Sequence, residues 1–469
     1  MTLMKSAKAN IIDAIGNTPI VRLNSVTQHL KKVNLYVKCE FMNPGGSVKD
    51  RIGIHMIERA EKEGLLKPGG TIIEATSGNT GLGLAMAAAI KGYKCIFVMA
   101  DKQSEEKRIA LRSVGAEVHV CPTNVEPEDP RSYYSVADRL AKETENSFYS
   151  RQYWNPANPE THYLTTGPEI WGQCGEELDA FIVALGTGGT VTGTSKFLKE
   201  KKPEIQVVGV DPVGSIYHHM FHTGEMGKAH SYYVEGIGED FMPTTIDLGC
   251  LDDCVQVDDK ESFVMARRLI REEGLLIGGS SGSAVAGAIR WAEKVEETLA
   301  DGETKNALII LPDSSSRYLS KFLDDEWLKD AGFLDRDPVQ PGVVKDLLGE
   351  KDDGLFAANK EDSLGSVIDR MKTHGISQLP VLDGEELKGL VSEVQILDAL
   401  VKGDVTMKSP VGPLATDAGV ARVTAQTPLA QLTEEFAAGK TAVVMKDEKA
   451  VGLLTKIDLI EHMAAHQHA

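Results

Sequence analysis

The segment "NPGGSVKDR", residues 43–51, places a lysine between a turn of small residues and an apolar helical pattern. The residues before Lys49 favour a turn, and "RIGIHMIERAEKEG", which follows it, predicts an amphipathic helix. A positive charge at a helix start opposes the helix dipole, and most lysines in such places are solvated. Burial and the positive end of the dipole both lower the pKa of a lysine. Lys49 is therefore a candidate for an uncharged amine that acts as a nucleophile or a base.

The glycine-rich segment "GTGGT", residues 186–190, lies between an apolar run and a helical pattern. Its backbone N–H groups could surround a phosphate at the start of a helix. It is not the dinucleotide-binding fingerprint, because valine occupies position 191 where the third glycine is required, and the Walker pattern is absent. By itself the segment is as compatible with a plain turn as with a phosphate site.

The segment "ATSGNTGLG", residues 75–83, combines N–H and hydroxyl donors and has no anionic side chain. Such a set suits a carboxylate better than a metal ion. Asn79 alone would be assigned as a helix cap. Together, however, a phosphate site, a carboxylate site and a lysine are what a pyridoxal-phosphate enzyme requires, since its lysine forms a Schiff base with the cofactor aldehyde. The hydroxyls come from Thr76, Ser77 and Thr80.

Apolar runs of strand length alternate with helical patterns from residue 71 to about 330. Strands that are buried on both faces have such continuous runs, and their alternation with helices predicts an α/β fold with a parallel sheet. Loops gather at the carboxyl edge of such a sheet, where ligands bind, so we expect the three segments to meet there. The runs are "TIIEA", "KCIFVMA", "AEVHV", "AFIVAL", "IQVVGVDP" and "NALIIL".

The composition changes at "DRDPVQPGVVKDLLG", whose prolines and mixed charges predict a linker. Beyond it, "ISQLPVLDGEELKGLVSEVQILDAL" parallels "KTAVVMKDEKAVGLLTKIDLIEHM" and forms an internal repeat. Units of this size bury little apolar surface alone, so we expect the two halves to pack together. A purely structural appendage is the alternative. The predicted divisions are a catalytic domain at 1–335, a linker at 336–345, and repeats at 346–404 and 405–469.

The length of 469 residues predicts two to four domains, and the net charge of −19 argues against nucleic acids and anionic membranes as partners. No segment has the pattern of a signal peptide or a membrane span, so the cytosol is expected. The six scattered cysteines do not form a disulfide framework. Neither "CLDDC", residues 250–254, nor "YHHMFH", residues 217–222, has a convincing ligand pattern, so no metal is expected.

At these motifs the chain resembles the cystathionine β-synthase family, within the fold-type II (tryptophan-synthase-like) pyridoxal-phosphate enzymes. "GGSVKDR" and "TSGNTG" are shared with the cysteine synthases, whereas "VEGIGEDF", "EEGLLIGGSSGS" and "ILPDSSSRYLSKFL" are more similar to cystathionine β-synthase. The paired repeats resemble the regulatory domain named after that enzyme. The resemblance covers nearly the whole chain. It implies an α/β catalytic domain with mostly parallel sheets, followed by a tandem β–α regulatory pair.

The resemblance also implies a role for each candidate residue. Lys49 would hold pyridoxal phosphate and then move the α-proton of the substrate, and Asn79 would hydrogen-bond the ring hydroxyl of the cofactor. Ser280 would face the pyridine nitrogen, which a serine cannot hold protonated as a carboxylate could, and this fits β-elimination. The residues implied to bind the phosphate are Gly186, Thr187, Gly188, Gly189 and Thr190. Those implied to bind the substrate carboxylate are Thr76, Ser77, Thr80 and Gln152.

The implied reaction replaces the hydroxyl of L-serine by the thiol of L-homocysteine and gives L-cystathionine and water, a step of transsulfuration in cysteine biosynthesis. A short segment precedes "IGNTP", so no haem is expected. Glu239 stands where many relatives have tyrosine, near the substrate entrance. Thr455 and Asp458 match the threonine and aspartate of S-adenosylmethionine sites in the family. A homodimer or higher homo-oligomer is also implied.

Two alternatives stay open. A cysteine synthase that uses O-acetylserine and sulfide would share Lys49 and "TSGNTG", although the "EGIG" stretch and the terminal repeats favour cystathionine formation. A non-catalytic sensor of an adenosyl ligand would require loss of the cofactor lysine, and Lys49 is intact. The terminal pair could bind S-adenosylmethionine or only hold subunits together.

Overall fold

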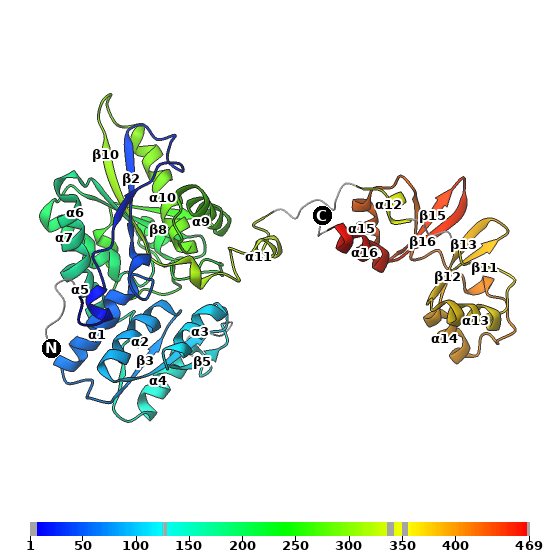
Figure 1. Cartoon of the computed structure of the whole chain (residues 1–469), viewed down its shortest axis with the longest axis horizontal. Coiled ribbons are helices and arrows are strands. Elements are labelled where there is room, and N and C mark those ends of the chain that lie inside the picture. The colour runs from blue at the N-terminus through cyan, green and yellow to red at the C-terminus, as the bar shows by residue number, and fades with distance from the viewer. Residues whose placement is uncertain (1–6, 124, 126–128, 335–341, 349–354, 467–469) are drawn as a thin grey trace. The chain divides into compact units, whose positions relative to one another are not determined.

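The computed structural model describes residues 7–123, 125, 129–334, 342–348 and 355–466. The chain forms two compact units that divide between residues 334 and 335 (Figure 1). Each unit is described by itself below. Within the described ranges, no helix is both long enough and apolar enough to cross a membrane.

A six-stranded sheet with the order β1-β2-β10-β7-β8-β9 forms the larger layer of the first unit. Only β1 runs antiparallel to its neighbour, and the other pairs are parallel. Alternate residues face opposite sides of a strand, and β7 shows the result: Ala180 and Ile182 join the core under α9 and α10, whereas Phe181 and Val183 join the core under α6 and α7. The strands are β1 (Ile20–Arg22), β2 (Val33–Cys39), β7 (Ala180–Ala184), β8 (Gln206–Pro212), β9 (Asp253–Val257) and β10 (Lys305–Leu311).

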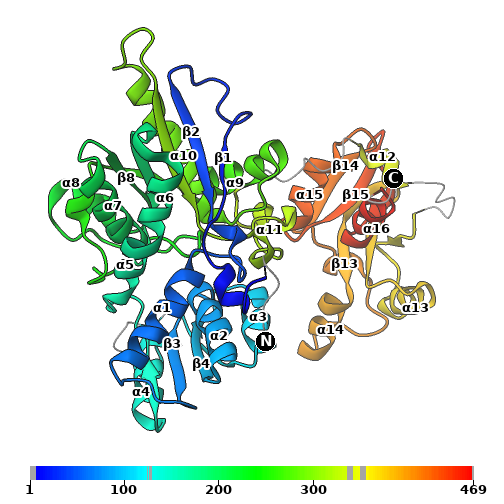
Figure 2. The ribbon, with the colours of Figure 1, turned by 60° about the vertical axis from the view of Figure 1, so that its left-hand side comes forward.

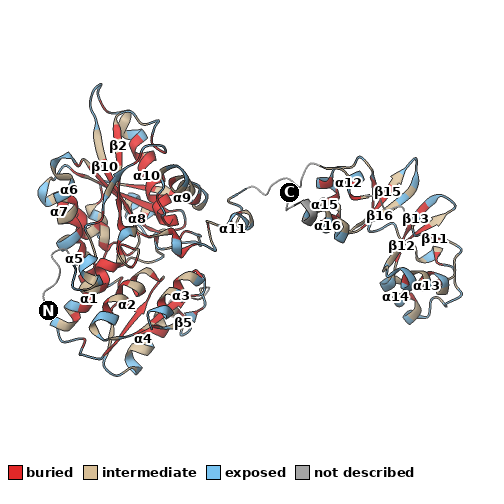
Figure 3. Ribbon diagram, in the orientation of Figure 1, coloured by how far each residue is buried: buried red, intermediate tan, exposed pale blue. Residues whose placement is uncertain are grey.

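Helices cover both faces of this sheet, and its strands are largely buried between them (Figure 3). The α-helices are α5 (Ala157–Thr161), α6 (Gly167–Cys174), α7 (Gly189–Lys201), α8 (Tyr217–Thr223), α9 (Asp259–Glu273), α10 (Gly279–Glu296) and α11 (Asp325–Asp330). A π-helical turn, η3 (His162–Thr166), joins α5 to α6. Short 3₁₀ turns are η1 (Ile11–Ala14), η2 (Glu40–Met42), η4 (Gly175–Glu177), η5 (Leu248–Cys250) and η6 (Ser315–Arg317).

A second, wholly parallel sheet with the order β5-β4-β3-β6 completes the first unit (Figure 2). The helices α1, α2 and α3 contribute to the core on one face of this sheet, and α4 contributes to the core on the other face. The strands are β3 (Thr71–Ala75), β4 (Lys94–Ala100), β5 (Glu117–Cys121) and β6 (Ser147–Tyr149). The helices are α1 (Lys49–Lys62), α2 (Asn79–Lys91), α3 (Glu105–Ser113) and α4 (Tyr133–Glu143). The predicted α/β fold with mostly parallel strands is confirmed.

The second unit contains two modules of the same design, each a three-stranded sheet with one parallel and one antiparallel pair. The first has β11 (Ala358–Asn359), α13 (Leu364–His374), β12 (Gln378–Asp383), β13 (Glu386–Ser392) and α14 (Glu393–Lys402), followed by the turn η7 (Gly412–Leu414). The second has β14 (Val420–Thr424), α15 (Leu429–Ala437), β15 (Thr441–Lys446), β16 (Lys449–Leu454) and α16 (Lys456–His466).

The two modules pack on each other through their sheets, as the repeat predicts. Leu387 and Leu390 from the first module form a buried cluster with Val443 from the second. The short helix α12 (Val344–Leu348) contributes Val344 to the core of the second module, although its residues fall in the predicted linker and first repeat. Residue 335 of the predicted catalytic domain and residues 336–341 of the predicted linker lie outside the described residues.

Candidate active site

The candidate segments lie around one cavity in the first unit. Lys49 is the first residue of α1, Asn79 is the first residue of α2, and Ser280 is the second residue of α10. The three segments and the start of α10 enclose this cavity from different parts of the chain. The candidate residues that line it are Lys49, Ser77, Asn79, Gly186, Thr187, Gly188, Thr190 and Ser280.

Four helices, α1, α2, α7 and α10, begin at this cavity. The first N–H groups of a helix have no partner within the helix, and they carry a partial positive charge. The cavity therefore has the electrostatic character of an anion site, although the described side chains that line it include only one cation, Lys49.

The pKa of the Lys49 amine is lower than that of an exposed lysine. Burial lowers the pKa of Lys49 to about 8, and the negative charge of Asp313 partly opposes this effect. A substantial fraction of the amine is therefore uncharged in neutral to mildly alkaline solution. This agrees with the prediction that the local environment makes Lys49 a nucleophile and a base.

Three side chains outside the predicted cofactor-binding set hydrogen-bond to the loop 186–190. Asn158 Nδ2 donates to the Thr187 hydroxyl (3.0 Å), and the Tyr217 hydroxyl donates to the Gly186 carbonyl (2.7 Å). The Thr190 hydroxyl pairs with Nε2 of His162 (3.2 Å). Gly188 has φ +82°, a conformation that favours glycine. These contacts fix the loop beside the cavity.

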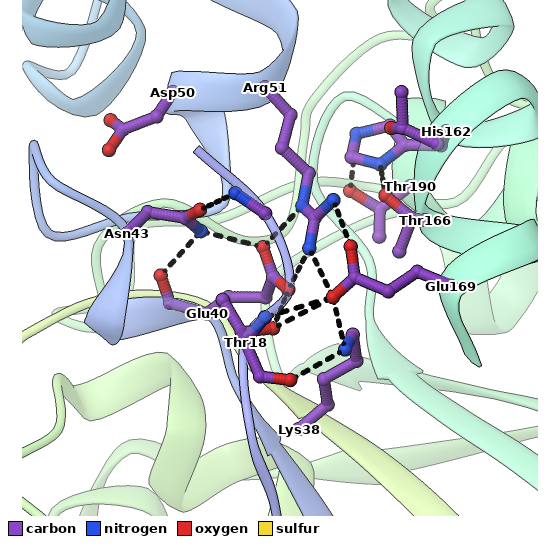
Figure 4. Close-up of polar contacts among 12 residues, drawn as sticks. Thr18, Lys38, Glu40, Asn43, Asp50, Arg51, His162, Thr166, Glu169 and Thr190 are labelled. Carbon is purple, nitrogen blue, oxygen red and sulfur yellow. Dashed lines mark hydrogen bonds and ion pairs between the residues drawn. The ribbon is translucent and has the colours of Figure 1, made fainter. Parts of the chain in front are cut away.

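His162 belongs to the π-helical turn η3, and both of its ring nitrogens are used. Nδ1 pairs with the Thr166 hydroxyl (2.8 Å), and Nε2 pairs with Thr190 (Figure 4). Burial lowers the pKa of His162 well below its usual value, and the nearby Lys49 adds to the effect. The ring is therefore neutral, and it orients Thr190 without bringing a charge to the loop.

The predicted carboxylate-binding residues divide into two groups. Ser77 lines the cavity, whereas Thr76, Thr80 and Gln152 are buried beside it. The Thr76 hydroxyl accepts from the N–H of Gly78 (3.0 Å), which supports the turn from within. The Thr80 hydroxyl donates to Gln152 Oε1 (2.6 Å). In this structure these three side chains thus shape the turn around Ser77.

A buried ion-pair network supports the start of α1 (Figure 4). Arg51 donates through Nε to Glu40 (2.7 Å) and through Nη1 to Glu169 (2.9 Å), and Lys38 Nζ donates to Glu169 (2.7 Å). Burial alone would raise the pKa of Glu169, but Arg51 and Lys38 lower it to about 2. Two cations therefore face two carboxylates, and the network fixes α1 two residues after Lys49.

Glu239 lies just beyond the cavity-lining residues Gly236 and Ile237. Burial raises the pKa of Glu239 to about 8, although a hydrogen bond with Tyr153 lowers it somewhat. An aromatic cluster that contains Tyr153 and Phe241 lies in the same region, with ring centroids 5.4 Å apart. Near pH 7 this carboxyl group is therefore mostly neutral.

The residues present fit pyridoxal phosphate. The 186–190 loop and the start of α7 offer donors for a phosphate, and Lys49 offers an amine for an aldehyde. Asn79 Nδ2 donates to Asp313 (2.8 Å), while Asn79 Oδ1 is buried and has no hydrogen-bond partner among the described residues. A buried polar atom of this kind favours a polar ligand at the same place.

Comparison with known proteins agrees with this arrangement. The family model for pyridoxal-phosphate dependent enzymes matches residues 11–313, and that for the CBS domain matches residues 344–402. Cystathionine beta-synthase of Dictyostelium discoideum is 39% identical over 477 residues, which cover 98% of this chain and 93% of the relative. The chain belongs to the cystathionine β-synthase family. It is a pyridoxal-phosphate-dependent enzyme, as predicted.

Other relatives support the same family. Cystathionine beta-synthase of Saccharomyces cerevisiae is 37% identical and covers 98% of both chains. Among solved structures, an O-acetylserine dependent cystathionine beta-synthase from Helicobacter pylori matches with a TM-score of 0.61 and 36% identity, over 68% of this chain and 99% of that one. A mutant of O-ureido-L-serine synthase matches with a TM-score of 0.60 and 38% identity, over 70% of this chain and 99% of that one. The first of these two proteins is named as dependent on O-acetylserine, and the structure of the second holds O-ureido-L-serine.

In the second unit, the two residues predicted to bind S-adenosylmethionine, Thr455 and Asp458, contact each other. The backbone N–H and the hydroxyl of Thr455 donate to Asp458 Oδ2 (2.7 and 2.9 Å) at the start of α16. Ser392 and Gln395 form the equivalent cap at the start of α14 in the first module. Both pairs follow the antiparallel strand of their module. The observed role of Thr455 and Asp458 is thus a helix cap.

The other cysteines and histidines considered as ligands have structural positions. Cys250 and Cys254 are free thiols, and Cys254 belongs to the core beside α7. The rings of His218 and His222 lie 4.4 Å apart on α8. In the described part of the chain, no group of three or more suitable side chains could hold a metal ion.

Proposed function

We propose that this enzyme replaces the hydroxyl of L-serine by the thiol of L-homocysteine, giving L-cystathionine and water. The observation that carries the proposal is the partly neutral Lys49 beside a phosphate-type loop, in a chain that aligns over nearly its full length with curated cystathionine β-synthases. In the reaction the Cβ–O bond of serine breaks and a Cβ–S bond forms. The thiol proton leaves with the hydroxyl as water.

Lys49, Asn79, Ser280 and the 186–190 loop would hold pyridoxal phosphate. Bound there, the cofactor supplies an electron-withdrawing ring that makes the α-hydrogen of an attached amino acid acidic. Lys49 Nζ takes this proton and later returns it to the α-carbon, which its pKa of about 8 permits. Ser280 lies at the positive end of α10 and offers a neutral hydroxyl.

The amino-acid carboxylate would be bound at the turn that starts α2. Ser77 offers its hydroxyl at the cavity, and the start of α2 carries the partial positive charge of a helix N-terminus. Thr76, Thr80 and Gln152 would contribute to carboxylate binding by supporting this turn through their hydrogen bonds.

Serine and O-acetylserine differ only in the leaving group, so an assay decides between them. We expect the purified full chain to form cystathionine from serine and homocysteine faster than it forms cysteine from O-acetylserine and sulfide. Lys49→Ala should abolish both reactions, whereas Lys62→Ala, at the other end of α1, should leave them unchanged. No cystathionine from serine, together with rapid cysteine formation, would show a cysteine synthase instead.

For the second unit we propose that Thr455 and Asp458 contribute to an S-adenosylmethionine site, as the family resemblance suggests; the CBS-domain match itself covers the first module, residues 344–402. Calorimetry on the full chain should show binding that Asp458→Asn weakens at least tenfold. Gln395→Ala removes the equivalent cap of α14 and should not weaken it. Equal binding by all three proteins would exclude Asp458 from the site.

The homo-oligomer and the cytosolic location stay predictions. The six free thiols fit a reducing compartment.

A further inference from the structure

Asp313 connects the backbone segments that carry the catalytic residues. It follows β10 and pairs with Ser47, two residues before Lys49, in an isolated antiparallel bridge. Its carbonyl oxygen accepts from the N–H of Gly278 (3.0 Å), two residues before Ser280. One residue thus fixes both the start of α1 and the start of α10 at the cavity.

The side chain of Asp313 makes the third connection. Oδ2 accepts from Asn79 Nδ2 (2.8 Å) at the start of α2 and from the Tyr318 hydroxyl (2.6 Å). The residue is only 1% exposed, and Oδ1 has no hydrogen-bond partner in the described part of the chain. A Cβ on Gly278 would overlap Oδ1, so the glycine leaves room for this carboxylate.

A buried carboxylate with an open oxygen needs a positive partner. Asp313 acts electrostatically on Lys49, whose pKa it raises against the larger lowering effect of burial. The neighbouring titratable groups do not supply that charge near neutral pH. Burial and Asp313 raise the pKa of Tyr318 well above its usual value, so its hydroxyl group is neutral. Two other cationic side chains lie nearby and have other partners: Arg317 donates to the Gly45 carbonyl, and Lys107, whose Nζ lies 4.4 Å from the centroid of the Tyr318 ring, pairs with Glu235.

We propose that Asp313 is a positioning residue of the active site: it orients the Asn79 amide and supplies the counter-charge of the Lys49 ammonium. Two consequences follow. The carboxylate stabilises the proton that Lys49 holds between its removal from and return to the α-carbon, and this part rests on the proposed function. The orientation of Asn79 and the charge on Lys49 do not depend on which substrate is used.

The first test uses the cofactor-free full chain, so that it is independent of the reaction. The pH dependence of acetylation of the Lys49 amine by acetic anhydride, followed by peptide mass spectrometry, gives its pKa. Asp313→Asn keeps the size of the side chain and removes the charge, and we expect the midpoint to fall by about one pH unit. Asp259→Asn, a carboxylate that accepts from Tyr233 and Val234 N–H groups, is the control and should leave the midpoint unchanged.

The second test addresses Asn79. Tyr318→Phe keeps the carboxylate and its bond to Asn79, and should leave affinity for pyridoxal phosphate within threefold of the original. Asp313→Ala removes the acceptor of Asn79, and should weaken this affinity at least tenfold in a titration followed by absorbance. An unchanged Lys49 midpoint in Asp313→Asn would overturn the counter-charge. Undiminished affinity in Asp313→Ala would overturn the orienting role. If Asp313→Ala does not fold, the test uses Asn79→Ala, which removes the oriented amide itself. This variant should bind pyridoxal phosphate at least tenfold more weakly, and undiminished affinity would overturn the orienting role.

Discussion

The helices that carry Lys49 and Asn79 approach each other through two glycines, and this contact can be tested. A Cβ on Gly53 of α1 would lie 2.7 Å from both the carbonyl oxygen of Gly83 and the backbone nitrogen of Leu84. The carbonyl carbon of Gly83 would lie closer still, and ordinary contacts begin near 3.4 Å, so the two helices would have to separate by more than about 0.7 Å. The obstructing atoms belong to the backbone and cannot rotate away.

We therefore expect Gly53→Ala to destabilise the first unit by about 1–3 kcal/mol, the usual cost of overpacking. The better helix propensity of alanine would offset about 1 kcal/mol of this. The same displacement moves Lys49 relative to Asn79. A shift approaching 1 Å at a reacting group costs up to about 10²-fold in rate, so turnover should fall more than stability alone explains.

Gly172→Ala is the matched control, because Gly172 lies on the exposed face of α6 and no described atom lies within 4 Å of a Cβ placed there. It should stabilise the protein by about 0.5–1 kcal/mol and leave turnover unchanged. All four tryptophans of the sequence lie before residue 335, so fluorescence during urea unfolding reports on the first unit alone. If Gly53→Ala proves as stable and as active as Gly172→Ala, the close helix contact does not position the site.

Three further predictions concern the surroundings of the site. Gly188→Ala, at φ +82° and against Ile246, should weaken binding of pyridoxal phosphate at least tenfold in a titration of the cofactor-free protein, and unchanged binding would contradict the loop's role. Arg51→Leu leaves buried carboxylates without their cation and should cost about 3–5 kcal/mol in urea unfolding; a loss below 1 kcal/mol would show that the network relaxes. Burial raises the pKa of Glu74 to about 7, whereas this carboxyl ionises near 4.5 in the unfolded chain. Only the unfolded state therefore gains from ionisation between these values, and stability falls as the pH rises through them. Glu74→Gln should remove at most about 3 kcal/mol of this fall, and equal pH dependence of both proteins would refute the assignment.

The strands that could be predicted are those whose residues are mostly apolar. "TIIEA" and "KCIFVMA" coincide with β3 and β4, because a strand buried on both faces excludes polar residues except where they are paired. β2 was not predicted, and it contains Lys38. That lysine is fully buried and pairs with Glu169, which lies 131 residues later in the chain. A partner at such a distance leaves no local pattern.

The active site shows the same difference between what local sequence patterns predict and what depends on distant parts of the chain. The sequence alone determined that Lys49, the turn before α2 and the 186–190 loop occupy helix starts after strands or turns, because glycine content and apolar periodicity act over a few residues. Only the tertiary structure decided that Asp313 and His162 contact them, and that the amine of Lys49 loses its proton near pH 8. Burial and through-space charge produce these effects, and both depend on segments that fold together from distant parts of the chain.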